Sequence, residues 1–214
     1  MLVCWSVGGG VGTSVVVAGL ATVARRTHDE ALVVDLAGDQ PLLWGAPEPS
    51  GPGLSAWLDA GPDVPPDALA RLAVEVGPGI SVMPRGQGQL SIDRAAALRD
   101  ALALDVRPVI VDAGLLASAT VAHVLATAAQ PSLLVARACP LTLRRLALLP
   151  ADPTGVVVVR DRRRGVTWQE VATAASAPVV AELEIDPAVA LAVDAGLDQR
   201  SFPRSFLRVL ETLR

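Results

Sequence analysis

A run of glycines near the N-terminus has the clearest chemistry in the sequence. Residues 8–14 read Gly-Gly-Gly-Val-Gly-Thr-Ser and lie between an expected strand and an expected helix. Glycines let the backbone pass close to an anion, and the N-terminus of a helix directs free N–H groups toward it. The segment therefore predicts a phosphate-binding loop, and the alternative is a tight strand-to-helix turn with no ligand.

Aspartates follow two of the expected strands. Asp35 closes one apolar run, Asp39 lies four residues later, and Asp112 closes a second apolar run. An aspartate after an apolar strand can hold Mg²⁺ through water, which makes Asp112 a candidate ligand. The alternative for Asp35 is a residue that caps a turn at the strand end, and for Asp39 we favour an ordinary turn.

The elements that must position these residues alternate between short β-branched runs and Ala/Leu-rich stretches. The expected strands are Leu2–Val7, Ala31–Leu36, Ile80–Met83, Val109–Asp112, Ser132–Ala136, Gly155–Arg160 and Val179–Leu183. The expected helices are Ser14–Arg26, Leu54–Asp59, Asp67–Val74, Arg94–Leu104, Thr120–Ala129, Leu141–Leu149, Gln169–Ala175 and two more at the C-terminal end, and residues 38–66 are expected to be mainly irregular.

Continuous apolar strands separated by helices predict an α/β fold, with a mostly parallel central sheet and helices on both faces. The length of 214 residues fits a single domain over residues 1–214. Ligands of such sheets bind at the carboxyl ends of the strands, where the glycine run and the aspartates fall.

Composition narrows the classes of function. All 18 basic residues are arginine, so no reaction can use a lysine side chain of this chain, and the bias is typical of a GC-rich genome of actinobacterial type. The net charge of −4 argues against a nucleic-acid coat protein.

Cys4 and Cys139 are not spaced as metal ligands are, and we expect reduced thiols in a cytoplasmic protein. We expect no secretory signal and no membrane span, because the sequence shows neither a basic n-region nor an apolar run of about 20 residues.

The glycine run resembles the deviant Walker A motif of the ParA/MinD-type P-loop ATPases, which reads Lys-Gly-Gly-Val-Gly-Lys followed by two Ser/Thr positions. Gly8 stands at the family's signature lysine, which reaches across a dimer to phosphate, and Thr13 stands at the Walker lysine. The resemblance implies a loop that could bind ATP or ADP with Mg²⁺. It assigns the nucleotide phosphates to Gly8, Gly9, Gly10, Val11, Gly12, Thr13, Ser14 and Val15.

The resemblance extends along nearly the whole chain. Asp35 matches the first aspartate of the family's D-x-D segment, Ala37 replaces the second, and Asp112 matches the Walker B aspartate. Because Ser14 matches the hydroxyl that binds magnesium in the family, the resemblance implies a metal site made of Ser14, Asp35 and Asp112. Arg160, Asp186 and Pro187 are placed by it on the side of the nucleotide base. The asparagine that reads adenine in the family has no counterpart, because the chain contains no asparagine.

Loss of both lysines predicts weak or absent ATP hydrolysis, since phosphoryl transfer depends on positioning and on cations. Our first hypothesis is a homodimeric pseudo-ATPase that regulates or scaffolds chromosome partitioning, septum placement or pilus and secretion assembly. The CpaE/TadZ proteins, which often have degenerate loops, are the most similar branch in character. The alternatives are an atypical active ATPase that uses an arginine or a partner's residue, and a nucleotide-free interaction module.

Three further features allow contacts with other molecules. A basic cluster, Arg160 to Arg164, is expected to be a solvated loop, and the alternatives are phosphate, DNA or an acidic partner. Arg144 and Arg145, near a helix start, are candidate interaction residues. The stretch 202–213 predicts an amphipathic helix, for which we favour docking on the sheet over membrane binding. We expect a cytoplasmic protein, with a position at the membrane or nucleoid periphery as the less favoured alternative.

Overall fold

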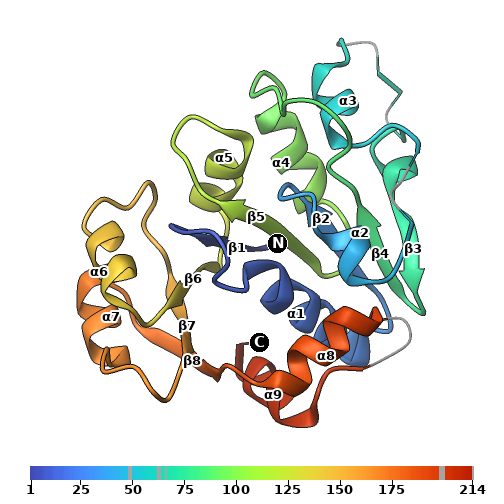
Figure 1. Cartoon of the computed structure of the whole chain (residues 1–214). Coiled ribbons are helices and arrows are strands. Elements are labelled where there is room, and N and C mark those ends of the chain that lie inside the picture. Colours follow the sequence, from blue (N-terminus) through green and yellow to red (C-terminus); the bar gives the residue numbers. More distant parts are fainter. Residues whose placement is uncertain (48–49, 62–63, 66, 198–200, 214) are drawn as a thin grey trace.

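A computed structural model describes residues 1–47, 50–61, 64–65, 67–197 and 201–213 (Figure 1). Parts of the predicted irregular segment 38–66 lie outside the described residues. The strands are β1 (Leu2–Ser6), β2 (Ala31–Asp35), β3 (Val74–Gly77), β4 (Ile80–Met83), β5 (Val109–Leu115), β6 (Ser132–Arg137), β7 (Gly155–Arg160) and β8 (Val179–Glu184). The helices are α1 (Thr13–His28), α2 (Gln40–Leu43), α3 (Leu54–Asp59), α4 (Ala95–Ala103), α5 (Val121–Ala128), α6 (Pro140–Leu146), α7 (Trp168–Ala175), α8 (Pro187–Ala195) and α9 (Arg204–Leu210), with 3₁₀ turns at Ala70–Leu72 and Glu211–Leu213.

The described strands form an eight-stranded sheet in the order β3-β4-β2-β5-β1-β6-β7-β8. Neighbouring strands are parallel except β3, which pairs antiparallel with β4. Helices cover both faces, with α1, α8 and α9 on one side and α3, α4, α5 and α7 on the other (Figure 1). The predicted α/β architecture with a mostly parallel sheet is therefore confirmed.

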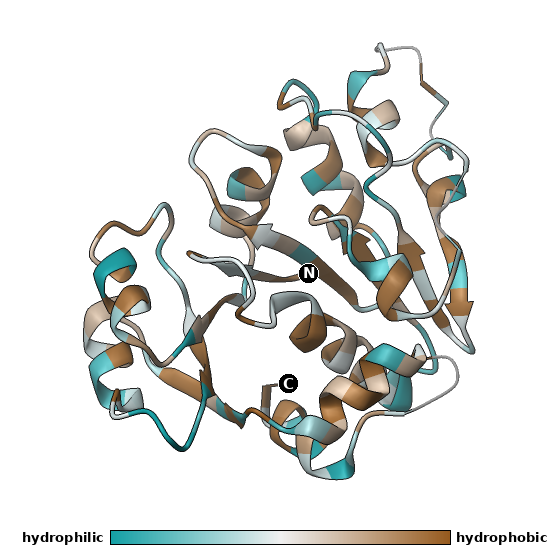
Figure 2. Ribbon diagram, in the orientation of Figure 1, coloured by the Kyte–Doolittle hydropathy of each residue, from teal (hydrophilic) through white to brown (hydrophobic). Residues whose placement is uncertain are grey.

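Two apolar clusters hold the helices against the sheet. Val17 of α1 and Leu207 of α9 belong to one cluster, and Leu98 of α4 and Leu125 of α5 belong to the other. All four side chains are fully buried. Figure 2 shows hydrophobic residues concentrated in the central strands and in α1. Strands buried on both faces need apolar residues at successive positions, which explains the continuous runs in the sequence.

The C-terminal helix packs on α1 through a close approach. A Cβ atom at Gly19 would overlap the side chains of Phe206 and Leu210, so the glycine makes room for α9. Phe206 is 8% exposed and Leu210 is fully buried. The expectation that this segment docks on the protein is confirmed, and its apolar face is not free for a bilayer. No helix among the described residues is both long and apolar enough to span a membrane.

The helix predicted over Asp67–Val74 is wrong. The segment holds only the 3₁₀ turn Ala70–Leu72, and Val74 begins β3, which sequence reasoning missed. The residues 74–79 read Val-Glu-Val-Gly-Pro-Gly, a β-branched pair before a turn, and Gly79 has φ 71°. This composition favours a hairpin with β4 over continuation of a helix.

Candidate functional site

The glycine loop connects β1 directly to α1, as the sequence predicts. Gly10 and Gly12 have φ values of 69° and 94°, in the left-handed region that favours glycine. α1 begins at Thr13, and no side chain caps its first turn. The backbone N–H groups of that turn are therefore available to an anion, and the helix dipole favours negative charge at the same place.

A cavity of about 890 Å³ opens at this loop. It lies at the carboxyl ends of the strands. Its lining comes from the glycine loop and the first turn of α1, the segments after β2 and β4, the end of β5, and residues 193–196 at the end of α8. Cβ atoms added at Gly9, Gly10 or Gly12 would meet nothing within 4 Å, so open space lies over the backbone. The volume is within the range of small-molecule and cofactor sites, and the cradle fits the phosphates of a nucleotide.

The two positions of the missing lysines are filled differently. Thr13 is 6% exposed, and its short side chain cannot carry charge into the cavity. At Gly8, an added Cβ would overlap Nη1 of Arg145, whose guanidinium carbon would lie 3.5 Å from it. Arg145 therefore occupies the space into which a side chain at position 8 would project. It belongs to α6 and does not line the cavity.

Gln40 joins the two predicted metal aspartates in one buried network. Its side-chain Nε2 donates to Asp112 Oδ2 at 2.7 Å and to the carbonyl oxygen of Ser14 at 3.0 Å. Its backbone N–H donates to Asp35 Oδ2 at 3.1 Å, and its Oε1 accepts from Nε1 of Trp44 at 3.3 Å. Gln40 has no exposed surface. Sequence reasoning missed this residue, because a glutamine after a turn belongs to no metal or catalytic motif.

The network has a consequence for the predicted metal site. Asp35 and Asp112 are fully buried and do not line the cavity, whereas Ser14 and Asp39 line it and are joined by a hydrogen bond of 3.3 Å from Ser14 Oγ to Asp39 Oδ2. The residues that the structure describes contain no group of three or more His, Cys, Asp or Glu arranged for a metal ion. Magnesium bound by Ser14, Asp35 and Asp112 stays a prediction.

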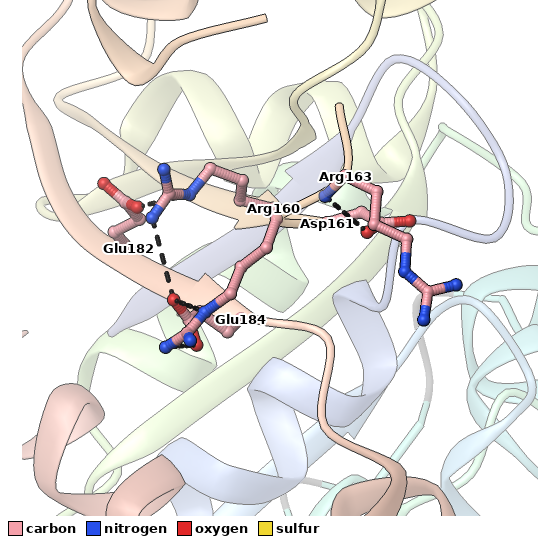
Figure 3. Close-up of polar contacts among 6 residues, drawn as sticks. Arg160, Asp161, Arg163, Glu182 and Glu184 are labelled. Atoms are coloured by element: carbon pink, nitrogen blue, oxygen red, sulfur yellow. Dashed lines mark hydrogen bonds and ion pairs between the residues drawn. The ribbon is translucent and has the colours of Figure 1, made fainter. Parts of the chain in front are cut away.

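The predicted base-side residues lie away from the cavity. Arg160, at the end of β7, pairs with Glu182 at 2.7 Å and with Glu184 at 3.6 Å, as Figure 3 shows. Asp186 accepts a hydrogen bond from the backbone of Ala188 and caps α8, in which Pro187 is the first residue. None of these three lines the cavity, so their contact with a base stays a prediction.

The rest of the basic cluster is also held locally. Arg162 donates a hydrogen bond to Glu184 and forms an ion pair with it. The backbone N–H of Arg163 donates to Asp161 (Figure 3). Exposed pairs of this kind contribute little to stability, because water and salt screen them. The arrangement agrees with a solvated loop.

Comparison with known proteins bears on the fold. No protein-family model matches the chain, and no curated protein matches it in sequence. Among solved structures, a ParA family ATPase from Chlorobium tepidum is 16% identical with a TM-score of 0.74, covering 99% of this chain and 98% of that one. The septum site-determining protein MinD from Pyrococcus horikoshii, complexed with Mg-ADP, is 15% identical with a TM-score of 0.75, covering 100% and 94%. An ATP complex of a McdA variant from Cyanothece is 19% identical with a TM-score of 0.69, covering 99% and 95%.

The chain has the ParA/MinD fold. The resemblance inferred from the loop motif is confirmed at this level, and the agreement extends over the whole chain.

The buried aspartate pair predicts a pH-dependent stability. Burial raises the pKa of Asp35 to about 7, with Asp112 adding to the effect and the N–H groups of Gly38 and Gln40 opposing it. Burial also raises the pKa of Asp112, against the hydrogen bond from Gln40. Between about pH 4 and 7 the folded state thus binds more protons than the unfolded state, so stability falls as pH rises through that window.

The raised pKa of Asp35 alone corresponds to a change in the free energy of unfolding of about 4 kcal/mol at most across this pH window. Denaturant unfolding between pH 4 and 8 measures the effect. We expect Asp35→Asn to flatten the dependence and Asp59→Asn, on the exposed end of α3, to leave it unchanged. An equal slope in wild type and Asp35→Asn would contradict the assignment.

Proposed function

We propose that the protein is a ParA/MinD-like regulatory or scaffolding protein that binds ATP or ADP and hydrolyses ATP weakly or not at all. One observation carries the proposal. The chain keeps an open phosphate cradle at Gly9, Gly10 and Gly12 but presents no cation from the loop itself. Backbone amides and a helix N-terminus suffice to attract phosphate, whereas transfer of the terminal phosphoryl group depends on charge stabilisation.

The Gln40 network supports the same conclusion. In a working site, carboxylates at these strand ends hold the metal that neutralises developing charge. Here the neutral side-chain amide of Gln40 donates to Asp112, and the backbone N–H of Gln40 donates to Asp35. The aspartates are thus satisfied without a metal ion. Two solved structures of this fold are complexes with Mg-ADP and with ATP, which supports nucleotide as the ligand.

We place the interface of a homodimer on the face around the glycine loop. Leu42 and Leu115 at the cavity rim are 80% and 62% exposed. Leu141 and Leu148 are 56% and 87% exposed and line an adjacent hollow with Arg145. Exposed apolar side chains grouped on one face are typical of an interaction surface. A second copy that covers the cavity would exclude water from bound nucleotide.

Light scattering with and without ATP and Mg²⁺ tests this interface. We expect the nucleotide to raise the mass from one chain to two, and Leu42→Asp to prevent the change. Leu104→Asp is the matched control, because Leu104 is 83% exposed and lies after α4, before β5 begins. Dimerisation that survives Leu42→Asp and fails with Leu104→Asp would place the interface elsewhere.

The fold also suggests the kind of cellular process in which the protein takes part. Proteins of this fold include MinD and McdA, and we propose a role in spatial organisation, such as chromosome partitioning, septum placement or assembly of pili and secretion machinery, with a CpaE/TadZ-like character. Titration calorimetry with ATP and ADP tests the nucleotide part. Binding without turnover supports the proposal, turnover above background supports an atypical ATPase, and no binding supports an interaction module.

A further inference from the structure

One cationic side chain lines the glycine-loop cavity among the described residues, and it does not come from the loop. Arg85 follows β4 and belongs to the cavity lining. Building on the nucleotide binding proposed above, we propose that Arg85 supplies the positive charge that holds the nucleotide phosphates, in place of the lysines that the loop lacks. It was not recognised from the sequence, where Pro84-Arg85-Gly86 indicates only the end of a strand.

The sheet register brings Arg85 to the site. β4 pairs with β2, with Met83 opposite Val34, so the residues after both strands emerge at the same edge as the glycine loop. Gly38 has φ 97°, and a Cβ there would lie 3.4 Å from Arg85 Cδ. The positive φ favours glycine at this position, and the distance shows that the stem of Arg85 lies against the loop that follows β2.

The guanidinium is oriented by backbone rather than by an acid. Nη1 of Arg85 donates to the carbonyl oxygen of Leu36 at 2.6 Å, and Nη2 makes a longer contact of 3.4 Å with the carbonyl oxygen of Gly88. No ion pair of Arg85 occurs among the described residues. Its charge is therefore not neutralised by a carboxylate, and a guanidinium has five N–H donors, which leaves several for an anion.

The charge balance of the cavity depends on this residue. The other charged residues of its lining are Asp39 and Asp194, both acidic and both exposed. Asp35 and Asp112 lie outside the lining, against Gln40. Without Arg85 the formal charge of the lining itself would be only negative, since Arg145, which lies against Gly8, is outside that lining. With Arg85, charge-assisted hydrogen bonds to phosphate oxygens become available.

Calorimetry with two ligands tests the proposal on the full chain. ADP with Mg²⁺ carries the phosphates, and adenosine lacks them. We expect Arg85→Gln to weaken ADP binding about 10- to 100-fold, as for loss of a charged hydrogen-bond partner, and to leave adenosine binding unchanged. Arg85→Lys keeps the charge, so its affinity for ADP should fall between those of wild type and Arg85→Gln. Arg71→Gln, which removes an exposed arginine paired with Asp67 outside the cavity, is the matched control.

The comparison of ligands within each variant separates the outcomes. A general loss of folding would weaken the binding of both ligands together. The proposal requires a selective loss of ADP binding, so the ratio of the ADP affinity to the adenosine affinity decides between them. A ratio equal in wild type and Arg85→Gln would overturn the role of Arg85 and leave nucleotide binding intact. If wild-type protein bound neither ligand, the proposed nucleotide function itself would fail.

Discussion

Purified protein should release phosphate from ATP at least about 10⁴-fold more slowly than a ParA/MinD-type protein that has both loop lysines. Removing a single group that stabilises the negative charge of the transition state typically raises the activation barrier by about 3–4 kcal/mol. In this chain Gly8 and Thr13 stand where the family has two lysines, so two such groups are absent from the loop. Arg85 faces the cavity and can bind phosphate, but its guanidinium is bonded to the Leu36 carbonyl on the side of β2. Steady-state phosphate release with excess ATP and Mg²⁺ measures the rate.

Variants of the same chain control for contaminating ATPases. Ser14→Ala and Asp112→Asn remove the hydroxyl and the carboxylate that a metal-dependent reaction would need. We expect the residual rate to be the same in wild type and in both variants. Turnover at a rate typical of the family, abolished by either substitution, would show a working ATPase instead.

Replacing Gln40 should have the largest effect on stability. Gln40→Ala removes the amide bonds to Asp112, Ser14 and Trp44 and leaves a buried carboxylate without its side-chain donor. Losing one partner of a buried charged hydrogen bond is costly, and we expect the free energy of unfolding to fall by about 3–4 kcal/mol. Urea unfolding at pH 7 measures the change. Gln169→Ala, on the exposed face of α7, should shift the midpoint little.

A second substitution at the same position tests whether the Gln40 amide takes the place of a metal ion beside the two aspartates. Gln40→Glu puts a third carboxylate beside Asp35 and Asp112, so at pH 8 the protein should lose stability through like-charge repulsion. Mg²⁺ should restore part of that loss in this variant and have little effect on wild type. If Gln40→Glu were as stable as wild type without divalent cations, the Gln40 amide would not be the group that satisfies the two aspartates.

Much of the fold was predictable because the strands are buried on both faces. Continuous apolar runs such as Val109–Val111 have no other place in a globular α/β domain, and the glycine loop marks where β1 meets α1. β3 was missed because its residues 74 and 75 are exposed and pair with one neighbour at the sheet edge. An edge strand of this kind carries little periodic signal.

The site was predictable only where backbone chemistry dictates residue type. Gly10 and Gly12 need left-handed φ values, so their pattern is visible in the sequence. Arg85 and Gln40 act through tertiary contacts with β2 and the loop after it, and nothing in their neighbours along the chain marks them. The expectation that Arg145 lies near a helix start is wrong, because Arg144 and Arg145 belong to the last turn of α6, where the helix dipole favours a cation. The contact of Arg145 with Gly8 depends on how α6 packs and could not be read from the sequence.

A single-turnover experiment tests the central claim most directly. Protein in slight excess over ATP is incubated with Mg²⁺, passed rapidly through a desalting column, and the retained nucleotide is identified by anion-exchange chromatography. We predict that nucleotide elutes with the protein and is still ATP after many minutes. Recovery of ADP and phosphate on the time scale of ParA/MinD-type ATPases, or elution of the protein without nucleotide, would contradict this claim.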